Sequence, residues 1–289
     1  MKVATAIGNL ARRDSVRRLE NVALGVLVVL AAALLYELLF DRSRYQIGID
    51  FYLYRSAASR WLAGGSFYWP HQLAGPYIVH GGWGTGDILY PPVALWLLVP
   101  FVYLPDPLWW AIPMLALTWA LWRLRPASWT WPILLLIALD PRTPSMFLWG
   151  NPAMWAMAAY AYGLLWAGPA VAVLIKPSLA PFAMAGMKQR RWWYALAVFA
   201  LACAPFGSLW VDYWHVIANG NLGPIYSLAD YIPMLLPLVA WIGRRRAIAR
   251  IGASRVRVPY STSSVQDLTS TSAEIAGEAR DPLPGEFKP

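Results

Sequence analysis

The sequence predicts an all-α polytopic membrane protein with about eight transmembrane helices and one further helix at the outer membrane surface. Hydrophobic residues make up 58% of the 289 residues, whereas charged residues make up only 13%, against about a quarter in soluble domains. The 18 tryptophans and 15 tyrosines belong to the residue types that gather at membrane–water interfaces. Several apolar runs also approach the ~20 residues that span a bilayer.

The formal net charge of +9 comes largely from basic residues that lie beside apolar runs. These basic groups are Arg12, Arg13, Arg17 and Arg18 before the first run, Lys188, Arg190 and Arg191 between two later runs, and Arg244, Arg245 and Arg246 after the last. This placement is typical of a positive-inside membrane protein in contact with anionic lipids, not of a nucleic-acid-binding protein. We therefore expect a multi-pass plasma-membrane protein with both termini in the cytoplasm.

Eight apolar runs are assigned to membrane spans: 21–40, 89–104, 107–122, 131–139, 152–166, 167–187, 192–210 and 225–242. The run 131–139 is shorter than the ~17 residues of a straight span, so a half-span or a re-entrant piece near 131–150 is an alternative. This topology places Arg142 inside the cell. It leaves Arg123 and Arg125 outside, as exceptions to the positive-inside pattern.

The spans define three regions. Residues 1–20 form a basic cytoplasmic lead-in, 21–242 form the transmembrane domain with outer loops at 41–87 and 211–224, and 243–289 form a tail that is basic and then disordered. The first run leads into no small-residue cleavage site, so it reads as a retained span and not as a removed signal peptide. The single cysteine, Cys203, excludes a disulfide within the chain and a cysteine-based metal site.

The outer loop 41–87 contains a predicted helix over residues 51–63, where Phe51, Tyr54 and Ala58 recur at helical spacing. Such an amphipathic helix is expected to lie on the membrane surface, and Gly64-Gly65 ends it. The remainder of the loop, 69–87, is rich in glycine and proline and is predicted to be irregular.

Two charged residues are the main candidates for chemistry. Asp50 immediately precedes the predicted helix 51–63, where a carboxylate can cap the helix; beside a low-dielectric surface it can also have a raised pKa and act as a base. Lys176 lies in the otherwise apolar run 167–187, where a charge by default marks function. It can bind a phosphate, and the alternatives are snorkelling to the interface or pairing with a buried acid.

The three histidines, His71, His80 and His215, all fall in the outer loops, but their spacing repeats no metal-ligand pattern. We therefore expect no metal and no cofactor. The sequence also lacks a glycine-rich phosphate loop followed by Lys-Ser/Thr, a Gly-x-Ser-x-Gly motif and a His-Glu-x-x-His motif. No paired inverted repeat of interrupted spans suggests a transporter.

A series of short motifs carries a family resemblance. In chain order they are Asp50 with Tyr52 and Tyr54, Leu62-Ala63-Gly64-Gly65-Ser66-Phe67-Tyr68, Tyr90-Pro91-Pro92 with Pro100, Gly150-Asn151-Pro152 and Lys176-Pro177. Over about residues 20–225 the chain resembles the GT-C superfamily of polyprenyl-phosphate-sugar-dependent glycosyltransferases. It is most similar to the actinobacterial mannosyltransferases and arabinofuranosyltransferases of phosphatidylinositol mannoside and lipoarabinomannan assembly. The usual Gly-Gln of that group is Gly150-Asn151 here, and the chain is shorter than typical members.

The resemblance implies that a sugar moves from a polyprenyl-phosphate donor to a lipid or glycan acceptor on the outer face, with inversion. Mannose is the first expectation for the sugar and arabinofuranose the second. Asp50 matches the family's catalytic aspartate, as general base. The residues expected to bind the donor phosphate are Arg55, Lys176 and His215, and those expected to contact sugar or acceptor are Tyr52, Trp83, Trp214 and Asn219.

A rival interpretation is a non-catalytic membrane protein, either an accessory subunit or a transporter of lipids or solutes. The short chain favours an accessory role, and a partner subunit would then supply further helices. A transporter is expected to carry ionisable groups on several facing spans, whereas Lys176 is the one deep charge evident in the sequence.

Overall fold

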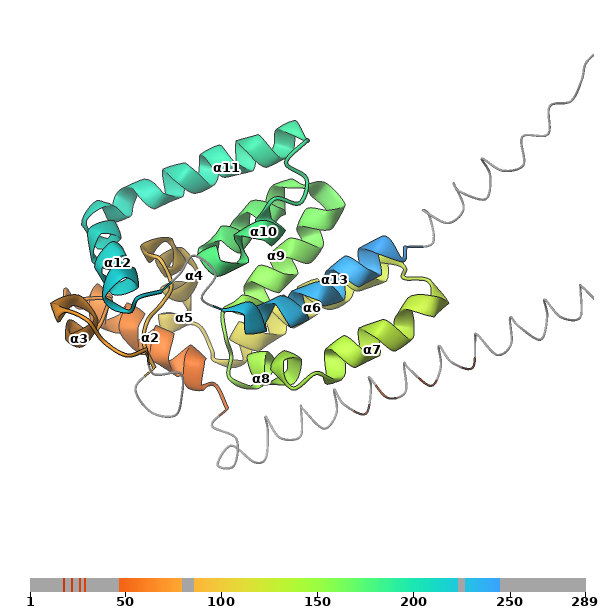
Figure 1. The fold of residues 1–289 in the computed structure, drawn as a ribbon, viewed down its shortest axis with the longest axis horizontal. Coiled ribbons are helices and arrows are strands. Elements are labelled where there is room, and N and C mark those ends of the chain that lie inside the picture. Colours follow the sequence, from red (N-terminus) through yellow and green to blue (C-terminus); the bar gives the residue numbers. More distant parts are fainter. Residues whose placement is uncertain are drawn as a thin grey trace, which may run out of the picture. The chain divides into compact units, whose positions relative to one another are not determined.

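The computed structural model describes residues 47–79, 86–222 and 227–244, together with Arg18, Val22, Val26 and Val29. The lead-in 1–20, the first predicted span and the tail therefore lie almost wholly outside the described residues. The chain divides into two units, Met1–Ala247 and Ile248–Pro289, and every described residue belongs to the first. Within the described ranges the chain forms helices and no strand, apart from one isolated bridge between Pro126 and Arg244, which confirms the all-α class (Figure 1).

The α-helices are α2 (Ile49–Leu62), α3 (Pro70–Ala74), α4 (Leu95–Leu98), α5 (Pro100–Tyr103), α6 (Pro107–Leu124), α7 (Trp131–Leu139), α8 (Arg142–Leu148), α9 (Ala153–Trp166), α10 (Ala180–Ala183), α11 (Arg190–Cys203), α12 (Gly207–Asn219) and α13 (Tyr231–Ile242). Short 3₁₀ segments are η1 (Pro92–Ala94), η2 (Ser128–Thr130), η3 (Gly168–Ile175), η4 (Pro177–Leu179), η5 (Ala204–Phe206) and η6 (Leu228–Asp230). The predicted helices at 51–63, 107–122, 131–139 and 152–166 are confirmed as helices. Prolines sit in the first turn of many of these segments, where a missing N–H costs little.

By length and composition, one helical stretch of the described chain, Arg190–Asn219, is long and apolar enough to cross a membrane. Pro92–Tyr103, Ser128–Leu139 and Tyr231–Ile242 are apolar but shorter. Figure 1 shows that the chain turns at η5, between α11 and α12. The structure therefore agrees with a membrane protein at this coarse level, while the eight predicted spans stay a prediction.

The core of the bundle forms where α6, α9, η3 and α13 pack together. Its largest fully buried side chains include Phe51, Trp109, Met154 and Met157. Gly163 of α9 allows the closest approach, because a Cβ there would lie only 2.5 Å from the Cβ of Ala170 in η3. The core thus continues from the α2 helix along the full length of α9.

The predicted second span, 89–104, contains one short helical stretch, Pro92–Tyr103, made of η1, α4 and α5. Both of its ends lie beside α2. At its start, Tyr90 bonds to Asn151, and Asp106, just after its end, bonds to Tyr52 and Arg55 of α2. Pro100 lies at the junction of α4 and α5, where Val99 keeps right-handed helical dihedrals, so the backbone stays helical from one to the other. A membrane crossing by this segment stays a prediction.

The predicted sixth span, 167–187, folds back on itself. Its two ends, Ala167 and Gly186, lie in contact, because a Cβ on Gly186 would lie only 2.5 Å from the Cβ of Ala167. Between them η3 leads inward to Lys176, and η4 and α10 lead back. Pro177 fixes an extended backbone at Lys176, whose φ of −125° and ψ of 94° break the helix. Lys176 therefore lies at the turn of a segment that folds back on itself.

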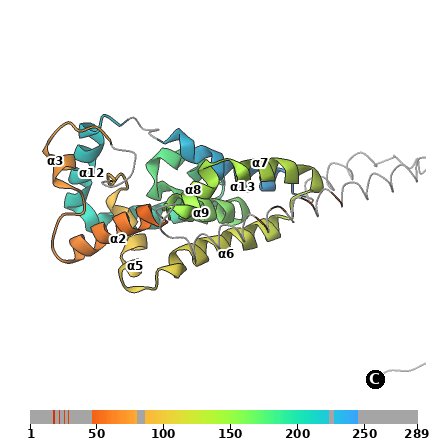
Figure 2. The ribbon, with the colours of Figure 1, turned by 90° about the horizontal axis from the view of Figure 1, so that it is seen from below.

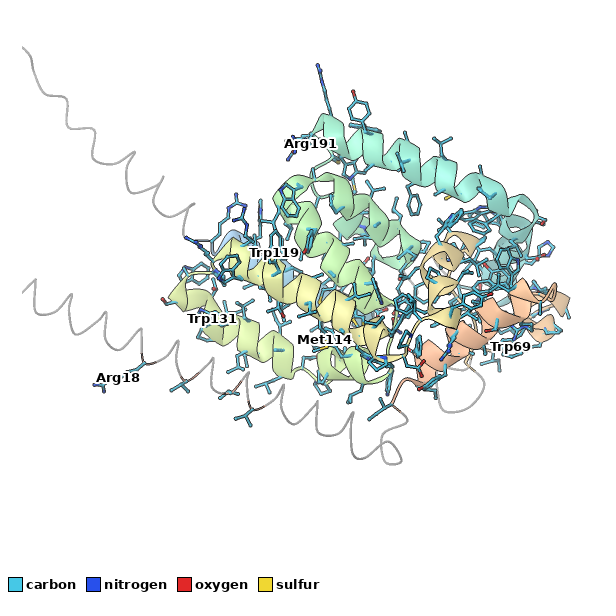
Figure 3. All side chains as sticks on the ribbon, turned by 180° about the vertical axis from the view of Figure 1, so that it is seen from behind. Arg18, Trp69, Met114, Trp119, Trp131 and Arg191 are labelled. Atoms are coloured by element: carbon cyan, nitrogen blue, oxygen red, sulfur yellow. The ribbon has the colours of Figure 1, made fainter. Side chains whose placement is uncertain are left out.

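The predicted outer loop 211–224 is helical up to Asn219, because it forms most of α12. Apolar residues on one side of α12 explain this outcome: Tyr213 and Val216 are buried, and the helix packs on α3. Reading the polar residues of this stretch as a loop signal missed that periodicity. Figure 2 shows α2, α3 and α12 grouped at one end of the first unit.

The two ends of the first unit differ in charge. The starts of α6 and α9 meet at one end, where the Trp109 indole donates to the Gly150 carbonyl at 2.8 Å. Their far ends meet where Trp119 stacks on Trp166, with ring centroids 5.5 Å apart. We call the far end the basic end, and its charged residues are Arg123, Arg125, Lys188, Arg190, Arg191 and Arg244. All carboxylates of the described residues lie elsewhere, namely Asp50, Asp87, Asp106, Asp140, Asp212 and Asp230.

Candidate functional site

The start of α2 is held by the end of α8. The N–H of Gly48 donates to the Leu148 carbonyl at 2.8 Å, and the N–H groups of Asp50 and Phe51 donate to the Trp149 carbonyl at 3.0 and 3.2 Å. These bonds satisfy backbone donors that a capping side chain usually serves. Asp50 lies inside the first helical turn and makes no capping bond to the backbone. The alternative that Asp50 is an N-cap was wrong, and its carboxylate is used differently.

The Asp50 carboxylate accepts a hydrogen bond from a side-chain amide far along the chain. Asn151 Nδ2 donates to Asp50 Oδ2 at 2.6 Å. The Asn151 Oδ1 atom accepts from the Tyr90 hydroxyl and from the Ala153 N–H, both at 2.9 Å. Because its oxygen is committed to these two donors, the amide can present only its NH₂ group to Asp50.

Gly150 allows this arrangement. Its φ of +67° is in the left-handed region, which side chains other than glycine rarely adopt. A Cβ at this position would lie 2.9 Å from the Phe51 Cβ and 2.9 Å from the Trp110 ring. The Gly150-Asn151 pair in the sequence therefore serves both backbone geometry and the contact with Asp50.

Lys176 and Asp230 form a buried ion pair, with Nζ 2.6 Å from Oδ2. Lys176 is only 5% exposed, and its ammonium also lies 5.4 Å from the centre of the Tyr90 ring. The Ser227 hydroxyl donates to the same Asp230 carboxylate. The sequence-based alternative in which Lys176 pairs with a buried acid is thus what the structure contains.

The ion pair lies close enough to Asp50 to affect its ionisation. Burial raises the pKa of Asp50 above its ordinary value of 3.8. The Asn151 hydrogen bond and the charge of Lys176 act in the opposite direction, and the charge of Asp230 adds to the increase in pKa. We call Asp50, Tyr90, Asn151, Lys176 and Asp230 the Asp50 cluster. It combines a carboxylate with a raised pKa, a fixed amide donor and a buried ammonium.

Two predicted site residues lie on a different side of α2. Arg55 Nη1 is 2.5 Å from Asp106 Oδ1, and the Tyr52 hydroxyl donates to Asp106 Oδ2 at 2.9 Å. Arg55 Nη2 also donates to the Val102 carbonyl at 3.2 Å. Asp50 and Arg55 are five residues apart, which places them about 140° apart around a helix. Tyr52 and Arg55 therefore hold the start of α6, and their predicted phosphate and sugar contacts remain untested.

The predicted residues on α12 lie apart from Asp50. Trp214 is 65% exposed and His215 is also exposed, so both face away from the core. Asn219 Nδ2 donates to the Gln72 carbonyl at 2.9 Å, and its own carbonyl accepts from the Tyr77 N–H at 3.0 Å. Asn219 thus fastens α12 to α3 and to the segment that follows it. Trp83 and His80 lie outside the described residues.

A second polar group lies beside α3. His71 Nε2 is 2.8 Å from Asp87 Oδ1, and the Asp87 side chain is buried while His71 is half exposed. Gln72, fully buried, bonds to both the carbonyl and the N–H of Ile88 through its side chain. These contacts fix the segment 86–88 that leads to Tyr90. Within the described ranges no group of three or more potential metal ligands comes together.

Comparison of the chain with protein-family models, with curated proteins and with solved structures finds no match. The resemblance to GT-C glycosyltransferases thus rests on the motifs of the sequence. The structure brings together four residues from those motifs, Asp50, Tyr90, Asn151 and Lys176, and adds Asp230. Asp230 was missed, although a carboxylate at the edge of the apolar run 225–242 is a signal for a buried partner.

Proposed function

We propose that this chain is a membrane glycosyltransferase that uses a polyprenyl-phosphate-linked sugar, with mannose as the first candidate and arabinofuranose as the second. The observation that carries the proposal is the Asp50 cluster, in which a partly buried carboxylate of raised pKa lies near a buried lysine. A base of raised pKa suits proton abstraction near neutral pH.

In the proposed reaction the acceptor hydroxyl oxygen attacks the anomeric carbon of the donor. The bond between that carbon and the phosphate oxygen breaks as the new glycosidic bond forms, so the anomeric configuration inverts. The hydroxyl proton passes to Asp50, and the lipid phosphate leaves with the bonding electrons. Asn151 orients the Asp50 carboxylate throughout through its 2.6 Å hydrogen bond.

Lys176 is the proposed contact for the leaving phosphate. An ammonium carries three N–H donors, so Lys176 can donate to Asp230 and to a phosphate oxygen at the same time. A cation placed where negative charge develops lowers the reaction barrier, and burial strengthens the effect. Asp230 and the Tyr90 ring hold the ammonium in position for this role.

We propose that the bundle sits in the plasma membrane with the basic end at the cytoplasmic side and the Asp50 cluster toward the outer side. The positive-inside tendency supports this orientation, because Arg123 and Arg125 then cease to be exceptions. In the bundle, α6 runs from the Asp50 end, where Asp106 contacts Tyr52 and Arg55 of α2, to the basic end. Arg142, by contrast, then lies toward the outer side, where it accompanies Asp140 at 3.8 Å.

A second candidate function is that of a non-catalytic subunit. It is favoured by the Lys176–Asp230 pair, which neutralises both charges without any substrate. In an accessory subunit the Lys176–Asp230 pair would serve only to stabilise the fold.

The direct test is transfer by the purified full chain in lipid nanodiscs. Radiolabelled polyprenyl-phosphate mannose, polyprenyl-phosphate arabinofuranose and a nucleotide-linked mannose are each offered with a lipid extract as acceptor. The proposal predicts a labelled product from a polyprenyl-phosphate donor with inverted anomeric configuration and none from the nucleotide donor. Failure of both lipid-linked donors with folded protein would favour the accessory role, and a retained configuration would contradict the single displacement.

A further inference from the structure

An open apolar hollow of about 720 Å³ lies on the side of the bundle, away from the Asp50 cluster. It is lined by Ile112, Leu115, Ala116, Thr118, Trp119 and Trp122 of α6 and by Tyr162 of α9. Several of these side chains are exposed although they are strongly apolar, Leu115 at 70% and Trp122 at 62%. An exposed apolar patch of this kind marks a surface that is covered by a partner or by lipid.

Stacked aromatic rings lie at the basic end of the hollow. The Trp119 ring stacks on Tyr162 with centroids 5.3 Å apart, and on Trp166 with centroids 5.5 Å apart. The Arg123 guanidinium lies over the Trp119 ring, 5.6 Å from its centre. An arginine so placed combines a planar array of donors with an apolar surface beside it, which suits a phosphate attached to a chain.

Two more arginines gather near Arg123. Arg125 follows at the end of α6, and Arg244 is brought beside this turn by the bridge between Pro126 and Arg244. The Arg244 guanidinium lies 4.4 Å from the centre of the Trp241 ring. Among the described residues no carboxylate forms an ion pair with any of these three arginines. An anionic group placed among them would relieve their mutual repulsion.

We propose that this hollow binds one anionic phospholipid, with its phosphate at Arg123 and Arg125 and an acyl chain along the α6 face between Ile112 and Trp122. Charge complementarity selects the anionic headgroup, and the apolar lining selects a hydrocarbon chain. The site differs from the Asp50 cluster in place and in chemistry. Its occupant is a lipid of the bilayer and not the sugar donor.

The proposal is tested by native mass spectrometry of the full chain with phosphatidylglycerol and phosphatidylcholine of identical acyl chains. The wild type is expected to retain phosphatidylglycerol in preference to phosphatidylcholine. Arg123→Gln is expected to lower phosphatidylglycerol occupancy by about fivefold, as expected for one basic residue near an anionic lipid. Arg142→Gln, which removes an exposed arginine from the opposite end, is the matched control and is expected to leave occupancy unchanged.

The apolar half of the site has its own pair of variants. Trp122→Ala removes an exposed wall of the hollow and is expected to lower occupancy by both phospholipids. Tyr103→Ala, at an exposed tyrosine of α5 with 77% exposure, is the control and is expected to have no effect. Arg123→Lys keeps the charge and is expected to keep the headgroup preference even if Arg123→Gln fails to fold.

Three outcomes would overturn the assignment. Equal occupancy by the two phospholipids would remove the charge argument. A loss in Arg142→Gln as large as that in Arg123→Gln would show that binding follows net charge alone. Displacement of phosphatidylglycerol by a polyprenyl phosphate in a manner that depends on Arg123 would assign the hollow to the donor lipid instead.

Discussion

Two faces of the same helix, α2, each bring a carboxylate and a cation together, with opposite physical consequences. On one face Asp50 lies near the buried pair of Lys176 and Asp230; on the other, Arg55 pairs with Asp106 where both side chains are about one-third exposed. Solvent screens the second pair, so its contribution to stability is about 0–1 kcal/mol. The charges on the Asp50 face are poorly solvated by water, so each depends on its partners for stabilisation. Burial therefore costs free energy on this face, but it also raises the pKa of Asp50, which suits a base.

The largest effect is expected from removing one partner of the buried ion pair. Lys176→Met leaves Asp230 charged, mostly buried and without its partner, which costs up to about 3–5 kcal/mol of unfolding free energy. Chemical denaturation in detergent measures this loss. The double variant Lys176→Met with Asp230→Leu is expected to regain most of the stability, because an apolar pair replaces the ions. It is expected to stay inactive, and recovery of transfer in the double variant would exclude Lys176 from the reaction.

A smaller loss is expected at the glycine that positions Asn151. In Gly150→Ala the alanine must adopt the left-handed backbone of Gly150, which costs about 1–2 kcal/mol of unfolding free energy. Its methyl group would also lie 2.9 Å from Phe51 Cβ. Gly64→Ala is the matched control, since Gly64 has φ of +85° but no atom within 4 Å of its added Cβ. Thermal unfolding of both variants separates crowding from backbone strain. Equal losses would mean that close packing at Gly150 is unimportant.

The pH dependence of transfer tests the role of Asp50 as a base in the wild-type protein. A general base acts only when ionised, so transfer is expected to fall as pH decreases through the raised pKa of Asp50, above the ordinary value of 3.8. Stability has the opposite sign: the raised folded-state pKa stabilises the fold at acid pH, and this contribution is lost as pH rises through that pKa. Asp50→Asn is expected to remove this pH-dependent contribution to stability. A transfer rate that stays constant down to pH 4 would contradict the assignment.

The smallest effect is expected on the exposed face. Arg55→Ala removes the partner of Asp106 and is expected to cost less than about 1 kcal/mol. It is expected to leave the transfer rate unchanged, because Arg55 lies on the other side of α2. Loss of transfer at unchanged stability would return Arg55 to the phosphate-binding role predicted from the sequence.

Local periodicity and composition were sufficient for the helices but not for their paths. The helix at α2 and the apolar helices α6, α7 and α9 follow from hydrophobic spacing. The segment 167–187 was assigned to a span from its composition, yet the chain folds back at Lys176-Pro177, so that Ala167 and Gly186 meet. A hydropathy count cannot distinguish a straight helix from a segment that folds back, because it depends on composition and not on the path of the backbone.

The candidate site was predictable in part. Lys176 stood out as a charge in an apolar run, and Asp50 stood out by its place before a predicted helix and by the family resemblance. The separation of Arg55 from Asp50 was also contained in the sequence, since a five-residue interval in a helix places two side chains on different faces. The Asn151 contact was not, because it joins residues 101 positions apart. Asp230 lay within a run treated as apolar, and pairing the two deep charges of opposite sign would have found it.

The central claim is tested most directly by comparing two aspartates, Asp50 within α2 and Asp106, which contacts α2 from the start of α6. Asp50→Asn and Asp106→Asn each remove one carboxylate charge and keep the side-chain shape. Single-turnover transfer from the polyprenyl-phosphate sugar is measured for both, with thermal unfolding as the control for folding. We predict that Asp50→Asn lowers the rate by about 10²–10⁴-fold and that Asp106→Asn keeps it near that of the wild type. A folded Asp50→Asn variant with the wild-type rate would contradict the account.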